Sequence, residues 1–163
     1  MRYLIKGKVL SWGDDFCIRD ADDRECFFVD GKVFSLGNKL SFQDMEGQEL
    51  AFISQRLLSW GPSYEIERNG AKHAVVKKNL FTLFRSKFNV EIGGPGNFTV
   101  DGDFFGHEYQ FRRGRDRIAQ VSKKWFSWTD SYGVDVQDGE DEVLILSCAI
   151  VIAQICRDAR RSG

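Results

Sequence analysis

A chain of 163 residues with only two prolines is long enough to bury one sizeable core and short enough to form a single domain. Its acidic and basic residues nearly cancel, giving a formal net charge of -1, which argues against nucleic-acid binding driven by the overall field of the protein. The first six residues carry charge and contain no continuous apolar run, so we expect no secretory signal and predict a cytoplasmic location.

The chain repeats itself with a period of about 24 residues. Similar segments occupy residues 9–13, 33–37, 57–61 and, more weakly, 80–84, and the clearest pair is Val9-Leu10-Ser11-Trp12-Gly13 with Leu57-Leu58-Ser59-Trp60-Gly61. Residues 50–60 also align without a gap on residues 118–128. The period corresponds to two strands and their two connections, so the chain is predicted to reuse one β unit.

Short polar turns separate the repeated segments at residues 20–23, 44–47, 68–70, 93–96 and 113–116. Their Asp, Asn and Gly residues favour the left-handed conformations of tight hairpins. Runs of strand length rich in β-forming residues lie between the turns, as in Phe88, Val90 and Ile92. We count about twelve strands from Tyr3 to Val136, and their regular spacing is typical of an all-β barrel or sandwich.

The last part of the chain changes from a strand pattern to a helix pattern. Acids at residues 138–142 suit a helix N-terminus, and the bases Arg157, Arg160 and Arg161 suit its C-terminus. Residues 143–156 are apolar except for Ser147 and Gln154, and this run is shorter than the roughly 20 residues that span a bilayer. A helix that is apolar almost all round must therefore be buried in protein.

A barrel of more than about eight strands has an interior to fill, whereas a β-sandwich has no central space for a helix. The sequence therefore predicts a mainly β fold, a closed antiparallel barrel of about twelve strands around a central apolar C-terminal helix. We expect residues 1–163 to form one domain, with the helix at about residues 141–158 and no transmembrane segment.

Five segments stand out by their order and spacing: Phe28-Val29-Asp30-Gly31-Lys32, Phe34-Ser35-Leu36-Gly37, Asp44-Met45-Glu46-Gly47, Lys123-Lys124-Trp125-Phe126-Ser127 and Asp130-Ser131-Tyr132-Gly133-Val134. Together they resemble the LURP-one-related family, a branch of the tubby C-terminal-like superfamily that also includes phospholipid scramblases. The resemblance covers nearly the whole chain and implies a twelve-stranded barrel around a central helix. It implies much less about function: tubby domains look like phosphoinositide binders, scramblases are linked to lipid movement, and many LURP-one-related proteins have no defined biochemical role. Tubby's lipid-binding positions do not match residue by residue here, so none is transferred.

The sequence contains no recognisable catalytic motif. It lacks a G-x-S-x-G elbow, a Walker loop and a dinucleotide fingerprint, and His73 and His107 have no second ligand or nucleophile at a suitable spacing. The four cysteines, Cys17, Cys26, Cys148 and Cys156, lack the spacing of zinc ligands. We therefore expect no metal, no cofactor and no enzymatic activity. The simplest hairpin register places Cys17 opposite Cys26, without a disulfide in a reducing cytosol.

An up-and-down barrel gathers every second connection at one end, and here those connections are the repeated segments. This end would collect Trp12, Leu36, Trp60, Leu83 and Trp128, joined by Phe104 and Phe105. The central helix would emerge there, because it enters the barrel from the opposite, polar-turn end. The lipid-binding residues predicted at this end are Lys77, Lys78, Lys123, Lys124, Arg157, Arg160, Arg161, Trp12, Trp60 and Trp128.

Aromatic residues beside bases suit the interface of an anionic membrane, including one that contains phosphoinositides. A non-enzymatic module that engages such lipid, or an unidentified protein partner, from the cytoplasmic side is the function that we expect. Three alternatives remain open at this stage. The aromatic residues can instead fold inward and plug the barrel, which the scarcity of exposed apolar patches on soluble proteins favours. The chain can also be an enzyme whose site is assembled from distant residues in the barrel mouth, or a purely structural barrel that binds a partner.

Overall fold

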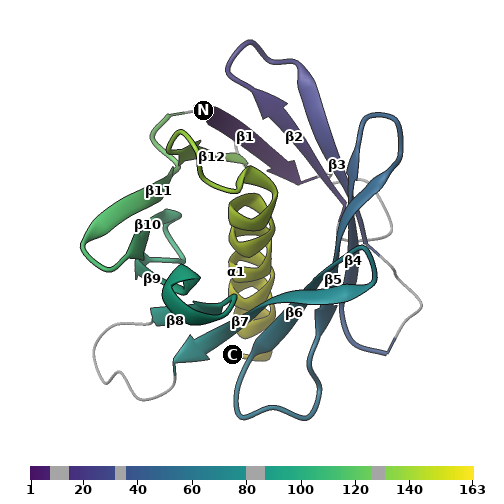
Figure 1. Cartoon of the computed structure of the whole chain (residues 1–163), viewed down its shortest axis with the longest axis vertical. Helices are drawn as coiled ribbons and strands as arrows, with labels where there is room; N and C mark the ends of the chain where they lie inside the picture. The colour runs from purple at the N-terminus through teal and green to yellow at the C-terminus, as the bar shows by residue number, and fades with distance from the viewer. Residues whose placement is uncertain (8–14, 32–35, 80–86, 126–130) are drawn as a thin grey trace.

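A computed structural model describes residues 1–7, 15–31, 36–79, 87–125 and 131–163. The described residues form twelve strands and one long helix (Figure 1). The strands are β1 (Arg2–Gly7), β2 (Phe16–Asp20), β3 (Glu25–Gly31), β4 (Lys39–Asp44), β5 (Glu49–Gln55), β6 (Ser63–Arg68), β7 (Ala71–Asn79), β8 (Lys87–Glu91), β9 (Phe98–Asp103), β10 (Glu108–Arg113), β11 (Asp116–Ser122) and β12 (Ser131–Val136). The helix α1 (Glu142–Ser162) follows β12, and a short 3-10 helix, η1 (Gly94–Gly96), links β8 to β9.

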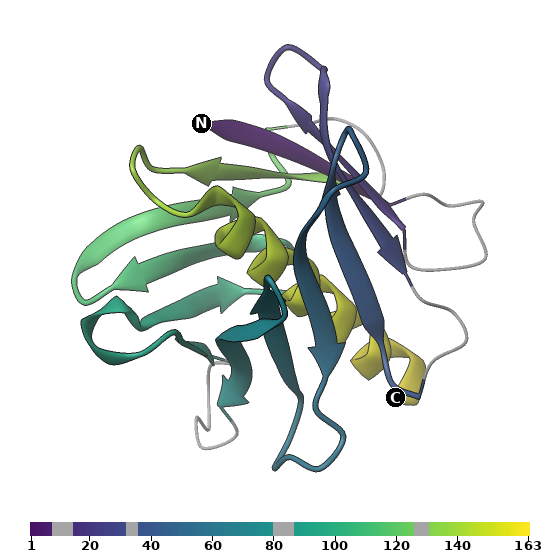
Figure 2. The ribbon, with the colours of Figure 1, turned by 45° about the vertical axis from the view of Figure 1, so that its right-hand side comes forward.

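The strands close into a single antiparallel barrel in which each strand pairs with its neighbours in sequence, and β1 pairs with β12. The helix α1 runs through the centre of the ring of strands, as the views in Figures 1 and 2 both show. The prediction of a closed barrel of about twelve strands around a C-terminal helix is therefore confirmed.

The alternation of side chains along each strand places one set of residues inside the barrel. Every strand contributes an apolar residue that is fully buried: Ile5, Ile18, Val29, Phe42, Ile53, Ile66, Val76, Val90, Val100, Phe111, Val121 and Val134. Several of these lie directly opposite one another on neighbouring strands, as in the pairs Ile5–Ile18 and Val121–Val134. Around the helix, Leu146, Cys148, Ala149, Ile150, Val151 and Ile152 are also completely buried, so helix and barrel share one core.

The helix is capped as its terminal residues predict. Asp141 is the N-cap, and its Oδ1 accepts a hydrogen bond of 3.1 Å from the Leu144 backbone N–H. Glu142 lies in the first turn, and Arg160 and Arg161 lie in the last. The helix ends at Ser162, about one turn beyond the expected boundary, because no glycine or proline interrupts the chain before Gly163.

The hairpin between β2 and β3 differs from the predicted register. Arg19 pairs with Glu25 beside the turn, and a β-bulge between Ile18 and Arg19 moves the pairing by one more residue, so that Cys17 lies opposite Phe28 instead of Cys26. All four cysteines are free thiols, and Cys148 and Cys156 are buried on the helix. Burial raises the pKa of Cys148, so this thiol stays protonated at neutral pH.

The two ends of the barrel are chemically different. The even-to-odd connections, such as residues 21–24, 45–48 and 69–70, are short polar turns beside the helix N-terminus. The described parts of the odd-to-even connections, residues 36–38, 56–62, 104–107 and 123–125, lie at the end of the barrel where α1 ends. We call this end, including the last turn of α1, the C-terminal rim (Figure 2). The predicted division between a polar-turn end and the end where the helix emerges is thus observed.

Candidate functional site

The end of α1 is attached to the C-terminal rim by side-chain contacts. Asn38 lies between β3 and β4, and its Nδ2 donates to Asp158 Oδ2 at 3.1 Å and to the Tyr64 hydroxyl at 2.9 Å. On another side, Arg160 Nη2 donates to the Phe105 backbone carbonyl at 2.9 Å, and its guanidinium lies 5.3 Å from the centre of the Phe105 ring. These contacts hold the arginine-rich last turn of the helix at the mouth of the barrel.

The predicted arginines and lysines all lie at the C-terminal rim, but their environments differ. The Arg157 guanidinium lies 5.7 Å from the Phe16 ring centre, and Arg161 is exposed in the last turn of the helix. Lys77 forms an ion pair of 3.2 Å with Glu91, so its charge is largely compensated. The Lys78 backbone N–H donates to the Pro62 carbonyl at 3.0 Å, which sets this lysine beside the connection from β5 to β6.

Lys123 and Lys124 follow β11 and have exposed side chains. Their backbone positions are fixed, because the Lys123 N–H lies 3.1 Å from both the His107 carbonyl and Glu108 Oε1, and the Lys124 N–H donates to Ser122 Oγ at 3.2 Å. The strand order puts them across the barrel mouth from the connection between β5 and β6. The predicted bases therefore surround the mouth of the barrel and do not form one compact cluster.

The predicted aromatic set divides between burial and exposure. Phe104 is 3% exposed and packs edge-on against Phe88, with ring centres 4.9 Å apart, so it closes the barrel from inside. Trp60 is 99% exposed and Leu36 is 82% exposed. The alternative that these side chains fold inward and plug the barrel is thus correct for Phe104 and wrong for Trp60 and Leu36. Trp12, Leu83 and Trp128 lie outside the described residues.

Two further exposed side chains, Leu57 and Leu58, were not among the predicted site residues. Leu58 is 103% exposed, and Leu57 is also more than half exposed. The sequence does indicate that these two leucines lie in a surface loop, because both immediately precede Ser59-Trp60-Gly61-Pro62, a run with turn-forming residues. Together with Leu36 and Trp60 they form a group that we call the apolar tip.

Local hydrogen bonds give the apolar tip a defined shape. The Ser59 hydroxyl lies 3.0 Å from the Arg56 carbonyl and 2.9 Å from the Gly61 carbonyl, and Gly61 adopts the left-handed φ of 79° that the turn requires. The Arg56 N–H donates to the Ser63 carbonyl at 2.9 Å and closes the base of the loop.

The connection carrying Leu36 is fastened to the connection carrying Leu57, Leu58 and Trp60. The Gln55 N–H donates to the Asn38 carbonyl at 2.9 Å, and the Asn38 N–H donates to Gln55 Oε1 at 3.2 Å. Leu57 lies over Gly37, where a Cβ would come within 3.1 Å of Leu57 Cδ2. Gly37 has a φ of 78°, so both its conformation and the close approach of Leu57 favour glycine. The two connections that carry the four apolar side chains are therefore joined to each other.

His107 lies at the same rim and packs against the barrel. Its ring stacks on Tyr132 with ring centres 4.5 Å apart and an interplanar angle of 8°. Burial, together with the nearby charges of Lys123 and Arg160, lowers the pKa of His107, so the ring is neutral at pH 7. This arrangement gives His107 a packing role at the barrel mouth.

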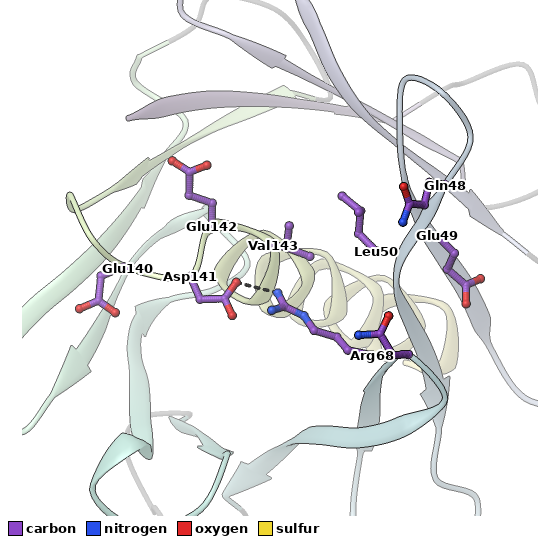
Figure 3. A pocket seen from close by; sticks show the side chains of 9 residues that line it. Gln48, Glu49, Leu50, Arg68, Glu140, Asp141, Glu142 and Val143 are labelled. Carbon is purple, nitrogen blue, oxygen red and sulfur yellow. Dashed lines mark hydrogen bonds and ion pairs between the residues drawn. The ribbon is translucent and has the colours of Figure 1, made fainter.

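A pocket of about 430 Å³ lies at the other end of the barrel, beside the start of α1 (Figure 3). It is lined by Gln48, Glu49, Leu50, Arg68, Asn69, Glu140, Asp141, Glu142 and Val143. Arg68 Nη2 donates to Asp141 Oδ1 at 2.6 Å, and the two side chains point toward each other across the pocket. In contrast, Figure 3 shows Glu49, Glu140 and Glu142 pointing in different directions.

Glu140 and Glu142 are each held by a partner from the barrel wall. Arg113 binds both oxygens of Glu140 at 2.8 and 2.9 Å, and the Tyr3 hydroxyl donates to Glu142 at 2.6 Å. Burial and this carboxylate both raise the pKa of Tyr3, so the phenol remains a donor. Among the residues that the structure describes, no three His, Cys, Asp or Glu side chains are grouped to hold a metal ion. The carboxylates at this end anchor the start of the helix to β1, β6 and β10.

Comparison with known proteins agrees with this architecture. A sequence profile of the family described as LURP-one-related matches residues 1–153. The chain belongs to the LURP-one-related family. It is also 38% identical over 152 residues to the uncharacterized protein YxjI of Bacillus subtilis (strain 168), covering 93% of this chain and 91% of YxjI. The predicted family is therefore confirmed.

A crystal structure of an Arabidopsis thaliana protein has a similar fold. The TM-score is 0.69 at 16% sequence identity, and the similarity covers 94% of this chain and 91% of the plant protein. At this identity the likeness concerns the fold alone. No helix in the described part of this LURP-one-related chain is long and apolar enough to cross a bilayer.

Proposed function

We propose that this LURP-one-related protein is a non-enzymatic binding module whose C-terminal rim engages the surface of an anionic phospholipid membrane. The observation that carries the proposal is the distribution of exposed apolar side chains. Of the seven large apolar residues that are exposed in the described part of the chain, five lie at this rim: Leu36, Leu57, Leu58, Trp60 and Phe105. An exposed apolar group of this kind on a soluble domain marks an interaction surface.

The charges around the rim favour an anionic partner. Lys123, Lys124 and Arg161 are exposed bases at this end, and none forms an ion pair among the interactions of the described residues. A base near an anionic membrane contributes roughly 1 kcal/mol, so three of them contribute about 3 kcal/mol. This energy corresponds to roughly a hundredfold increase in membrane partitioning, and it weakens as salt screens the charges.

The filled interior supports a binding role over catalysis. The completely buried Leu146 and Ile150 occupy the barrel centre, which leaves the mouth closed by packed side chains such as Phe104. The pocket at the polar-turn end contains acids whose oxygens are already held by Arg68, Arg113 and Tyr3. A catalytic acid or base would need a free position within reach of a substrate.

Vesicle sedimentation tests the proposal. Wild-type protein is mixed with phosphatidylserine-containing vesicles, with phosphoinositide-containing vesicles and with phosphatidylcholine vesicles, at low and at physiological salt. We expect binding to the two anionic compositions that decreases with salt, and a loss of most binding when Lys123 and Lys124 are replaced by glutamate.

A matched control changes the net charge by the same amount at the opposite end. Lys72 and Arg115 are exposed residues of the polar-turn end, so Lys72→Glu with Arg115→Glu removes two bases without altering the rim. We expect this control to keep most of the wild-type binding. The proposal is wrong if wild-type protein binds no vesicles at either salt, or if the rim and control variants lose the same amount of binding.

A further inference from the structure

We infer that the apolar tip, Leu36, Leu57, Leu58 and Trp60, inserts below the headgroups of an anionic phospholipid bilayer and anchors the rim there. This inference rests on the proposed function and adds a hydrophobic anchor to the electrostatic contact. It also gives the barrel an orientation, with Leu36 and residues 57–60 deepest in the membrane.

The nearly complete exposure of the apolar side chains at the tip favours a lipid bilayer as the partner. Leu58 and Trp60 are 103% and 99% exposed, which means that the barrel covers almost none of either side chain. A projecting apolar tip can be buried only by a partner that surrounds it. A fluid lipid interface does this without a shaped pocket, and tryptophan is enriched at the level of the headgroups.

The polar groups of the tip are compatible with insertion. Ser59 stands between the apolar side chains, but its hydroxyl is bonded within the loop to the Arg56 or Gly61 carbonyl. The Arg56 N–H is likewise bonded to the Ser63 carbonyl. Burying an unbonded hydroxyl or amide would oppose insertion, so these internal bonds lower the cost of leaving water.

The bases beside the tip are placed to meet lipid phosphates. Arg56 begins the loop and is exposed, and Lys78 lies next to its other end through the bond from its N–H to Pro62. Their long side chains can reach the headgroups while the leucines and Trp60 lie deeper. The charge of this region thus complements an anionic bilayer, and the same bases would disfavour a basic partner surface.

The tip is also rigid enough to act as one unit. Two backbone and side-chain bonds join Asn38 to Gln55, and Asn38 is bonded in turn to Asp158 of the central helix. The inserted side chains are therefore connected through α1 to the core of the barrel. The two loops are thus held in a fixed arrangement while the tip is inserted.

Tryptophan fluorescence with phosphatidylserine vesicles tests the insertion. The spectrum of the Trp60→Phe variant is subtracted from that of the wild type, so that the difference reports Trp60 alone. We expect this difference spectrum to shift to shorter wavelength on vesicle binding and to be quenched by lipids brominated in their acyl chains.

A substitution at the tip tests the contribution to affinity. We expect Leu58→Asp to lower the vesicle partition coefficient at physiological salt at least about tenfold, the effect of losing one inserted leucine. Met45→Asp is the control, because Met45 is an exposed apolar residue in the turn between β4 and β5 at the opposite end. It should bind like the wild type, and both variants should keep the wild-type melting temperature.

The outcomes separate the anchor from the proposed function. If wild-type protein sediments with anionic vesicles but the Trp60 signal stays unchanged and Leu58→Asp binds normally, insertion is wrong and the electrostatic contact remains. If wild-type protein does not bind anionic vesicles at all, both proposals fail. A Trp60 shift and a selective loss in Leu58→Asp support the anchor.

Discussion

Replacement of Ile150 by aspartate is the most direct test of the central helix. Ile150 is completely buried near the middle of α1, where barrel residues surround it. Losing a buried isoleucine side chain costs about 2–5 kcal/mol, and an unpaired ion in such a place costs several kcal/mol more. The carboxyl group would instead take up a proton, but a pKa raised by about 3–5 units carries a similar cost at neutral pH.

Together, the lost isoleucine side chain and the buried carboxyl group cost about as much as the whole unfolding free energy of an ordinary domain, about 5–15 kcal/mol. We therefore expect Ile150→Asp to be unfolded or insoluble at neutral pH, whereas Ile150→Val should lose only about 0.5–1.5 kcal/mol. Urea denaturation followed by circular dichroism measures both variants, and partial recovery of Ile150→Asp at acid pH would reflect protonation of the carboxylate. A soluble Ile150→Asp protein with an unchanged melting temperature would refute a buried central helix.

Two further predictions concern stability, and urea denaturation measures both. Gly102 has a φ of 139°, and an ideal Cβ there would lie 2.6 Å from the Glu108 carbonyl oxygen. Gly102→Ala should therefore lower the free energy of unfolding by at least about 1–3 kcal/mol. Gly114→Ala, at a turn with no atom within 4 Å of its Cβ, should cost clearly less, and equal losses would contradict the steric argument. Arg113→Ala should cost about 1 kcal/mol through loss of the two bonds to Glu140. Arg113→Lys should recover only part of this loss, because lysine cannot bind both oxygens in the same way.

The sequence was sufficient to predict the fold because it contains two strong patterns that fit together: a set of strands that can close into a barrel, and an apolar helix that must be buried inside one. The alternating apolar residues of twelve short segments indicate strands, and the apolar run from Val143 to Cys156 indicates a helix that must be buried. Up-and-down pairing follows from the short polar turns, and it correctly predicts that Arg157 and Arg160 emerge at the end of the barrel opposite these turns. These conclusions depend on periodicity and length, which a single sequence contains.

The details of the rim depend on information that periodicity does not contain. Phe104 and Trp60 are both aromatic residues of odd-to-even connections, yet one is buried and the other is exposed. Their positions depend on local loop conformation, such as the left-handed Gly61 and the bonds of Ser59. The ion pair of Lys77 with Glu91 likewise requires the pairing register of β7 with β8 across a connection. The Cys17 register was mispredicted because the pairing beside the turn, Arg19 with Glu25, and the bulge between Ile18 and Arg19 each displace it by one residue.

Asp141 joins the start of the helix to the barrel wall through charge and capping together. Its carboxylate accepts bonds from the Leu144 N–H and from Arg68, and His73 Nε2 lies 3.7 Å away. Burial raises the pKa of Asp141, but the bonds from Arg68 and Leu144 outweigh burial, and the net pKa lies below its usual value. A group whose native pKa is depressed stabilises the fold above the unfolded pKa, near 3.9, and loses this contribution as pH falls through the native pKa.

Asparagine is as good an N-cap as aspartate but carries no charge, so two substitutions separate the two roles. At pH 7 we expect Asp141→Ala to cost about 1–2 kcal/mol and Asp141→Asn less than about 1 kcal/mol, because the partly exposed pair with Arg68 is screened by solvent. The difference in unfolding free energy between wild type and Asp141→Asn should then shrink below pH 4, as the wild-type carboxylate becomes protonated. Denaturation from pH 7 to pH 3 measures this trend, and a difference that stays constant would mean that the charge of Asp141 does not stabilise the helix start.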